Sequence, residues 1–219
     1  AGEVWVAEGT YTAAVPGTVV VTLQPYCDLY GGFSGVETRR DQRDYKAHVC
    51  HIDGMGQSAC VYGADNARID GFTITGGNGP LRYGSAGNLG QSLTPMTAAL
   101  TSSSPSYDLT HIIAVDNSGP APTLANCVVA DNPAMIVVGN APQGRTYLYP
   151  RISGCAFSES AHSNAAVFNC APTGILLRAE IADCSFGGAG FGIVDYTASG
   201  SCGAAVSRSV FAANATAYA

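Results

Sequence analysis

The densest group of side chains that could do chemistry lies between residues 37 and 51 of the chain. It interleaves acids with bases: Glu37, Asp41 and Asp44 with Arg39, Arg40, Arg43 and Lys46. Such a group could catalyse acid–base steps or bind an acidic or sugar ligand, but alternating opposite charges are more typical of a salt-linked surface loop. We therefore expect a structural loop here. Catalysis by Asp41, Asp44 or Arg43 and ligand binding are the alternatives.

Cleavage of a polysaccharide would need acids in a particular arrangement. Glycoside hydrolysis needs two carboxyl groups roughly 5 to 9.5 Å apart, and a calcium-dependent lyase needs an acidic calcium cluster together with a basic residue. Asp70 and Asp183 instead fall at a chain corner of the repeat described below, which favours a turn role. The sequence also lacks adjacent aspartates, Gly-His-Gly, Arg-x-Lys and Gly-x-Ser-x-Gly. We predict no catalytic residue.

The nearest approach to a metal-ligand pattern is His48, Cys50 and His51. The two histidines would lie on opposite faces of an extended strand and could not readily reach one ion, and we expect Cys50 to be oxidised. The other histidines, His111 and His162, have no evident Ser or Asp partner in the sequence. We predict no metal site and no cofactor.

Eight cysteines, an even number without any C-x-x-C, favour disulfides in an oxidising compartment over zinc sites. The candidates are Cys27, Cys50, Cys60, Cys127, Cys155, Cys170, Cys184 and Cys202. Cys127, Cys155 and Cys184 share one repeat position, where small buried apolar side chains are the first interpretation and bridges between neighbouring coils the second. The other five are the better bridge candidates. A sequon at Asn214 adds a possible glycosylation site, and we expect a secreted or cell-surface protein.

The elements that must position these residues follow from a repeat. Apolar anchors recur at Ile69, Leu124, Ile152, Ile181 and Val206, with intervals of 55, 28, 29 and 25 residues. The first interval is about two of the others, so the period is near 27 residues. Each period also carries a second short apolar strand, such as "AMIVV" at 134–138. This pattern indicates one coil per period.

A corner interrupts each repeat two residues after its anchor. Gly71, Asn126, Gly154 and Asp183 occupy this place and accept left-handed backbone angles at low cost, whereas Arg208 does not fit the rule. A short strand, a tight corner and another strand, repeated every 27 residues or so, predict a parallel β-helix with coils stacked about 4.8 Å apart. We expect an all-β chain with a single domain over 1–219 and an irregular insertion at 79–110.

Three motifs of the first third resemble a known family: "GEVWVAEGTYT", "LYGGFSGVETRRDQRDYKAHVCHIDG" and "ARIDGFTITGGN". They are similar to the right-handed parallel β-helix domains of secreted and surface bacterial proteins, the pectate-lyase-like and polymorphic-outer-membrane-protein-like repeat group. The resemblance covers residues 2–78 and is only rhythmic beyond. It implies a right-handed, single-stranded β-helix of about seven to eight coils. It says little about activity, because members of this group are mostly adhesin-like or wall-associated.

Both ends of such a coil stack would expose unpaired backbone groups and inward apolar side chains. Either the chain continues in a longer protein, or the top coil of one subunit stacks on the bottom coil of the next. The subunit-contact candidates are Val4, Trp5, Val6, Val206, Val210 and Phe211. Eleven tyrosines would serve either such contacts or a glycan-binding face.

The composition excludes some classes of binding partner. The net charge is −6, and the few bases outside residues 39–46 are scattered, so no nucleic-acid partner is expected. No apolar run reaches the roughly 18 residues of a membrane span. We expect a non-catalytic extracellular structural protein that assembles with copies of itself into a filament or surface layer. The alternative is a polysaccharide-binding adhesin, lyase or glycosidase on the same scaffold, with cell-surface glycans as possible partners.

Overall fold

The structure of the chain, a computed structural model, contains three large parallel β-sheets. The described residues are 2–58, 60–64, 66–77, 92–93, 107–108, 113–116, 123–130, 137–140, 147–158, 165–171, 176–188, 191–197, 201–212 and 216–218. The predicted insertion at 79–110 lies largely outside them. Within it, β9 (Ser92–Leu93) and β10 (Tyr107–Asp108) form a short antiparallel pair.

The strands of each large sheet are bonded in an order that follows the chain. Sheet A contains β1 (Gly2–Ala7), β4 (Cys27–Phe33), β7 (Arg68–Asp70), β12 (Thr123–Ala125), β16 (Arg151–Ser153), β19 (Leu176–Ala182) and β22 (Ser201–Ser207), with β15 (Tyr147–Leu148) also paired to β19. Sheet B contains β2 (Gly9–Tyr11), β5 (Cys50–Ser58), β8 (Phe72–Gly77), β13 (Val128–Ala130), β17 (Ala156–Ser158), β20 (Ser185–Gly187) and β23 (Val210–Ala212). Sheet C contains β3 (Val21–Thr22), β6 (Val61–Gly63), β11 (Ile113–Asp116), β14 (Val137–Asn140), β18 (Ala165–Ala171), β21 (Phe191–Thr197) and β24 (Thr216–Tyr218).

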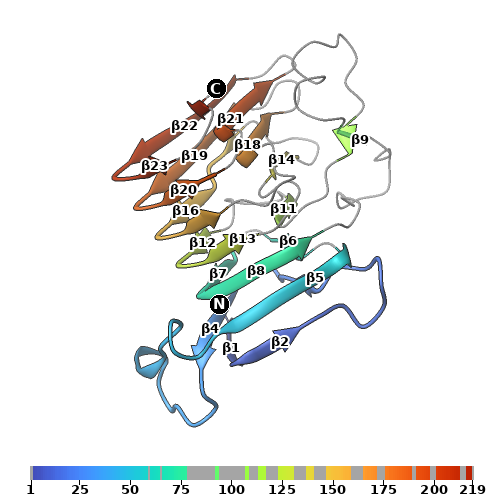
Figure 1. Ribbon diagram of the computed structural model, residues 1–219, viewed down its shortest axis with the longest axis vertical. Helices are drawn as coiled ribbons and strands as arrows, with labels where there is room; N and C mark the ends of the chain where they lie inside the picture. The colour runs from blue at the N-terminus through green and yellow to red at the C-terminus, as the bar shows by residue number, and fades with distance from the viewer. Residues whose placement is uncertain are drawn as a thin grey trace.

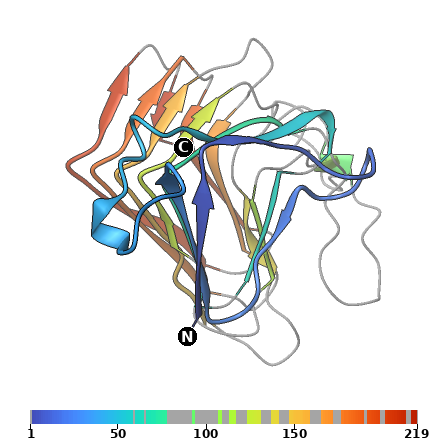
Figure 2. The ribbon, with the colours of Figure 1, turned by 90° about the horizontal axis from the view of Figure 1, so that it is seen from below.

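The chain visits sheet A, then B, then C, and returns to A one strand further along. Every pairing within these three sheets is parallel, for example β12 with β7 and with β16. Figure 1 shows the strands stacked from the N-terminal end, in blue, to the C-terminal end, in red, and Figure 2 shows them superimposed along the stack. The only helical element among the described residues is the 3-10 turn η1 (Arg40–Gln42). The prediction of an all-β chain with parallel strands, compatible with a β-solenoid, is confirmed.

The predicted anchors form one column inside the stack. Ile69, Leu124, Ile152 and Ile181 are direct partners on successive strands of sheet A, and each is at most 4% exposed. Because neighbouring parallel strands lie about 4.8 Å apart, residues at equal register stack as like on like. The interpretation of the 55-residue first interval as two periods was wrong for sheet A, because Ile69 and Leu124 are direct register partners on neighbouring strands.

The predicted corner is present at all five repeats. The φ angles are +82° at Gly71, +50° at Asn126, +62° at Gly154, +55° at Asp183 and +47° at Arg208. The four expected residue types therefore adopt the left-handed conformation. Arg208, which the residue-type rule did not include, adopts it as well, because its strand keeps the register of the coil below.

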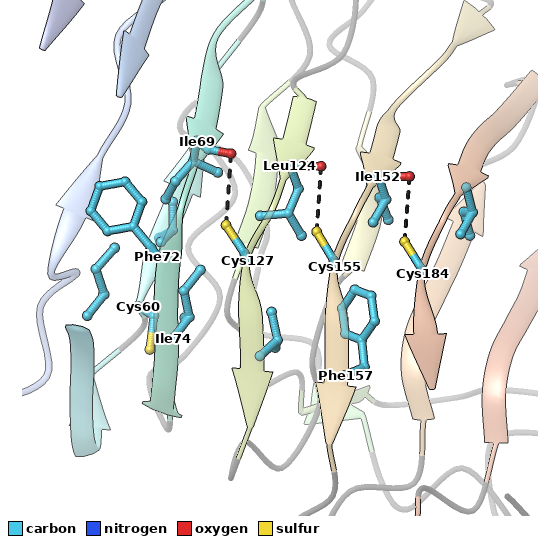
Figure 3. Packing of buried hydrophobic residues seen from close by; sticks show 14 of the residues in the cluster. Cys60, Ile69, Phe72, Ile74, Leu124, Cys127, Ile152, Cys155, Phe157 and Cys184 are labelled. Atoms are coloured by element: carbon cyan, nitrogen blue, oxygen red, sulfur yellow. Dashed lines mark hydrogen bonds between the residues drawn. The ribbon is translucent and has the colours of Figure 1, made fainter. Parts of the chain in front are cut away.

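The inward cysteines bond to the main chain rather than to one another. Cys127, Cys155 and Cys184 each donate a thiol hydrogen bond to the carbonyl oxygen two residues earlier, at 3.1, 3.3 and 3.2 Å. Each thiol also lies 3.8 to 4.0 Å from a carbonyl oxygen of the preceding coil, as Figure 3 shows. Burial raises the pKa of the Cys155 thiol well above its usual range. The first interpretation of these three residues, as small buried side chains, describes their packing.

The expected disulfides are absent among the cysteines that the structure describes. Cys27, Cys50, Cys60, Cys127, Cys155 and Cys184 are all free thiols. The expectation that Cys27 and Cys50 form bridges was wrong for a geometric reason: strand pairing places Gly2 beside Cys27, and Gly9 and Phe72 beside Cys50, so no second sulfur stands next to either. Cys60 instead donates to the Thr75 carbonyl at 3.1 Å. The side chains of Cys170 and Cys202, and Asn214, lie outside the described residues.

Candidate functional site

The charged residues from Glu37 to Lys46 lie in a loop between β4 and β5, as predicted, and Cys50 and His51 begin β5. The Glu37 carboxylate accepts hydrogen bonds from the backbone N–H of Ser34, Gly35 and Val36 at 2.9 to 3.1 Å and from the Ser34 hydroxyl at 2.8 Å. These bonds, led by the Ser34 backbone N–H, lower the pKa of Glu37 to about 2. Glu37 therefore organises the start of the loop.

Arg43 fastens this loop to the corner of the next coil. Its Nη2 lies 2.6 Å from Oδ1 of Asp70, and its Nη1 donates to the carbonyl oxygens of Gly31 and Asp70 at 3.0 and 3.1 Å. Its guanidinium also lies 5.0 Å from the centroid of the Tyr30 ring. Every contact of Arg43 is with the fold itself, which supports a structural role over the catalytic alternative.

The Asp70 carboxylate is the most buried charge of the described chain, with its side chain 3% exposed. Burial alone would raise its pKa, but hydrogen bonds from Asn126 at 3.0 Å, Arg43 at 2.6 Å and Arg68 at 2.8 Å outweigh burial and lower the pKa of Asp70. Asp183 also lies at its corner, where Arg208 donates to both of its oxygens at 2.6 and 2.8 Å. Asp183 occupies the left-handed corner itself, whereas Asp70 is the last residue of β7, directly before the corner at Gly71.

The remaining acids of the loop have local partners. Asp44 accepts from the backbone N–H of Lys46 and Ala47 at 3.0 and 3.1 Å, and its pKa is lowered by these bonds, the one from Ala47 first. Asp41 pairs with Arg39 at the exposed surface, 3.1 Å away. Neither acid faces a second carboxyl group in these contacts.

The structure separates the three residues of the metal pattern. His48 Nδ1 lies 3.0 Å from a Glu8 carboxylate oxygen, which raises the pKa of His48, whereas His51 Nε2 lies 2.7 Å from the Thr75 hydroxyl. The Cys50 thiol lies 3.1 Å from the Ala7 carbonyl oxygen, and burial raises its pKa. Among the described residues no group of three His, Cys, Asp or Glu side chains could hold a metal ion.

A polar groove that sequence analysis did not predict lies on the outer face of sheet A. Its volume is about 510 Å³, and it is lined by Asp28, Asn66, Ala67, Arg68, Thr123, Tyr149, Arg151 and Glu180. Five of these residues, Asp28, Arg68, Thr123, Arg151 and Glu180, are register partners on β4, β7, β12, β16 and β19. They occupy the outward position directly before the anchor of each repeat, so the groove follows the stack.

Two arginines and two acids give the groove its charge. Arg151 Nε lies 2.9 Å from Glu180 Oε2, and Arg68 Nε lies 2.8 Å from Asp70. Both ion pairs are made through Nε, and the two arginines lie on β7 and β16, the strands that flank Thr123. Asp28 accepts from the Tyr30 hydroxyl at 3.1 Å. This arrangement can donate hydrogen bonds to hydroxyl or carboxylate oxygens of a ligand.

The same geometry argues against hydrolysis by the two acids that line the groove. Asp28 and Glu180 are four register steps apart. At about 4.8 Å a step, their strands are about 19 Å apart, which is far beyond the roughly 5 to 9.5 Å that a glycosidase pair requires. The groove therefore suits binding better than cleavage.

The predicted subunit-contact residues lie on the first and last strands. Val4, Trp5, Val206 and Val210 are 46%, 36%, 38% and 63% exposed. Val6 and Phe211 are half-buried against the core. Trp5 stacks on Phe33 with ring centroids 4.9 Å apart, and Phe211 stacks on Phe186 at 4.7 Å.

Among the described residues, no helix has both the length and the apolar character of a membrane span.

Comparisons with protein-family models, curated proteins and solved structures find no match for this chain. The similarity to pectate-lyase-like and polymorphic-outer-membrane-protein-like repeats therefore rests on the three quoted motifs. The parallel all-β arrangement is compatible with that family but does not assign the chain to it.

Proposed function

We propose that this protein is a non-catalytic extracellular structural protein, a right-handed parallel β-helix whose subunits stack head to tail into a filament or surface layer. Sheets B and C each contain seven strands, which supports seven coils. The extracellular location is proposed from the sequon at Asn214 and from the resemblance to secreted and surface β-helix domains, because the six described cysteines are free thiols and lend it no support.

The observation that carries this proposal is the presence of matching edge strands at the two ends of the stack. β1, β2 and β3 are the edges at one end, and β22, β23 and β24 are the edges at the other. Each is bonded to the stack through one neighbour, so the other edge carries a row of backbone donors and acceptors without a strand beside it in the described chain.

The ends are also compatible in direction. All pairings in the three sheets are parallel, so the last strands of one copy can pair with the first strands of the next as strands pair inside the stack. Partly exposed Val4 at one end and Val206 at the other, both members of the inward column, would lose contact with water. A head-to-tail contact of this kind repeats without closing unless its rotation forms a ring.

Sedimentation velocity over a range of protein concentrations tests this function. We expect species larger than the monomer, and we expect Val4→Lys or Val206→Lys to shift the distribution toward the monomer. Val36→Lys is the matched control, because Val36 is 84% exposed but lies in the loop between β4 and β5. A protein that stays monomeric at high concentration would refute the proposal.

The polar groove supports a second candidate function, the binding of a polysaccharide at the cell surface. Arg68, Thr123 and Arg151 offer donors along the groove, and the Tyr149 ring, 47% exposed, could stack on a sugar. Titration with neutral and uronic-acid oligosaccharides tests this candidate. Arg151→Gln should weaken binding and Arg39→Gln, in the loop, should not. Equal binding by both variants, or none by the wild type, would contradict it.

A further inference from the structure

The aliphatic column of sheet A reaches both ends of the stack without a break. Strand register joins Val4 to Leu29 and Leu29 to Ile69 at one end, and Ile181 to Val206 at the other. The residues between are Leu124 and Ile152. Because both terminal members are valine and both are partly exposed, a further coil added at either end would meet the side-chain type that already occupies this column.

On sheet B, the inward register partners from Tyr11 to Phe211 form a column, here called the aromatic column, that has an aromatic side chain at each end. Phe157, Phe186 and Phe211 stack with centroids 4.9 and 4.7 Å apart and interplanar angles of 3° and 8°. The same register leads through Val129, Ile74 and Ile52 to Tyr11. The Tyr11 ring is held beside Gly9, and its hydroxyl donates to the Ala7 carbonyl at 2.8 Å. A second copy would therefore bring the Phe211 ring to the Tyr11 ring.

The corners at the two ends carry opposite charges. Arg208 directly precedes Ser209, whose hydroxyl accepts from the Cys184 backbone N–H at 3.2 Å, and Glu8 directly precedes Gly9, the register partner of Cys50. Ser209 and Gly9 thus end the column of inward residues that contains Cys50, Cys127, Cys155 and Cys184. Arg208 is paired with Asp183 and Glu8 with His48, but the Arg208 side chain is 69% exposed and the Glu8 side chain 53%, so each can contact a further charge. The φ of Arg208, +47°, is the left-handed angle of the corner in every repeat, and a residue with a side chain adopts it at a cost.

We propose that two copies join in one register, with β22 of one copy beside β1 of the next and β23 beside β2. Val206 then packs on Val4 of the next copy, Phe211 stacks on Tyr11, and Arg208 lies beside Glu8. The interface continues the three columns with like residues and adds one ion pair at the corner. This inference rests on the proposed function and specifies its interface.

Cysteine cross-linking tests the register in a Cys27→Ser background. Thr10 and Val210 each lie one residue before a terminal member of the aromatic column, on the outer face of sheet B, and both are exposed. In the proposed register they are neighbours on adjacent strands, at about 4.8 Å, within the roughly 4.4 to 6.8 Å between Cα atoms that a disulfide spans. Thr12 lies two residues further along, which adds about 6.6 Å along the strand and puts it out of reach.

With oxidised glutathione as electron acceptor, we expect Thr10→Cys with Val210→Cys to give a ladder of covalent multimers on non-reducing gels. Thr12→Cys with Val210→Cys should give at least tenfold less. Preferential cross-linking of the second pair, in a protein that assembles under reducing conditions, would overturn the register and leave the proposed function intact. The absence of assembly in sedimentation under reducing conditions would overturn both.

Substitution at Arg208 gives an independent readout. Arg208→Gly removes the exposed ion pair with Asp183 but places glycine at a backbone angle that it accepts, so the thermal unfolding midpoint of the monomer should change little. Its self-association constant should fall at least threefold, and the difference from wild type should shrink at high salt. Unchanged association of Arg208→Gly at low salt would contradict the ion pair with Glu8.

Discussion

At the scale of single residues, Asp70 links three parts of the chain that are distant in sequence. Arg43 reaches it from the loop, Arg68 from its own strand and Asn126 from the next coil. The sequence could predict a salt-linked loop from alternating charges, but it could not predict this pairing. The partner of Arg43 is 27 residues away, and only the stacking of coils brings the two together.

We expect Asp70→Asn to destabilise the protein strongly. It leaves the guanidinium groups of Arg43 and Arg68 beside a neutral side chain. Breaking a buried ion pair by removing one partner typically costs 3 to 5 kcal/mol, so we expect a loss of about 3 kcal/mol in the free energy of unfolding, with Arg68 partly exposed.

Urea unfolding at pH 7 measures this loss. The control is Asp41→Asn at the exposed Arg39 pair, which should lose less than about 1 kcal/mol. Equal losses in the two variants would contradict the role assigned to Asp70.

Acid should weaken the loop through Glu37. Its pKa in the folded protein is about 2, below the value of about 4.3 expected in the unfolded chain. A lowered folded pKa contributes stability above the unfolded pKa, and this contribution is lost as the pH falls through the folded pKa. Between pH 4.5 and 2, stability should fall more steeply for wild type than for Glu37→Gln, as measured by urea unfolding at each pH. Parallel curves would contradict this account.

At the scale of elements, the repeat shows what the sequence could predict and what it could not. Anchor spacing and the corner residue types predicted the inward column and the left-handed turns, because both depend on local residue types. The polar groove was missed because its outward residues, Arg68, Thr123, Arg151 and Glu180, share no chemical type and form a surface only through strand register. Bridges expected at Cys27, Cys50 and Cys60 are absent, and spacing along the chain could not show this, because it does not tell which residues become neighbours across coils.

The corner at Gly154 requires a residue without a Cβ. Its φ is +62°, and a Cβ there would lie 2.7 Å from the Asn126 Oδ1. We expect Gly154→Ala to lower the free energy of unfolding by about 1 to 2 kcal/mol, the usual cost of the left-handed conformation for a residue with a Cβ. Gly203→Ala is the control, because nothing lies within 4 Å of its added Cβ. A similar small change in both variants, in thermal or urea unfolding, would show that the corner tolerates a side chain.

At the scale of the whole molecule, parallel pairing makes the stack polar, with distinct first and last coils. The sequence predicted this polarity through its 27-residue period, since a repeated coil in one direction must have two different ends. The sequence showed only in part that the two ends of the stack match. The pairs Val4 with Val206 and Tyr11 with Phe211 belong to common columns because of register over the whole stack, which local patterns do not contain.

The axial repeat of the assembled protein tests the account most directly. Sheets B and C each contain seven strands, and at about 4.8 Å a strand the proposed assembly would have a rise of about 34 Å between subunits along a filament. Electron cryo-microscopy of protein assembled at high concentration measures this rise. The account predicts filaments with a subunit repeat of about 34 Å and continuous sheets across each joint. Isolated monomers, or assemblies in which the subunits lie side by side, would contradict it.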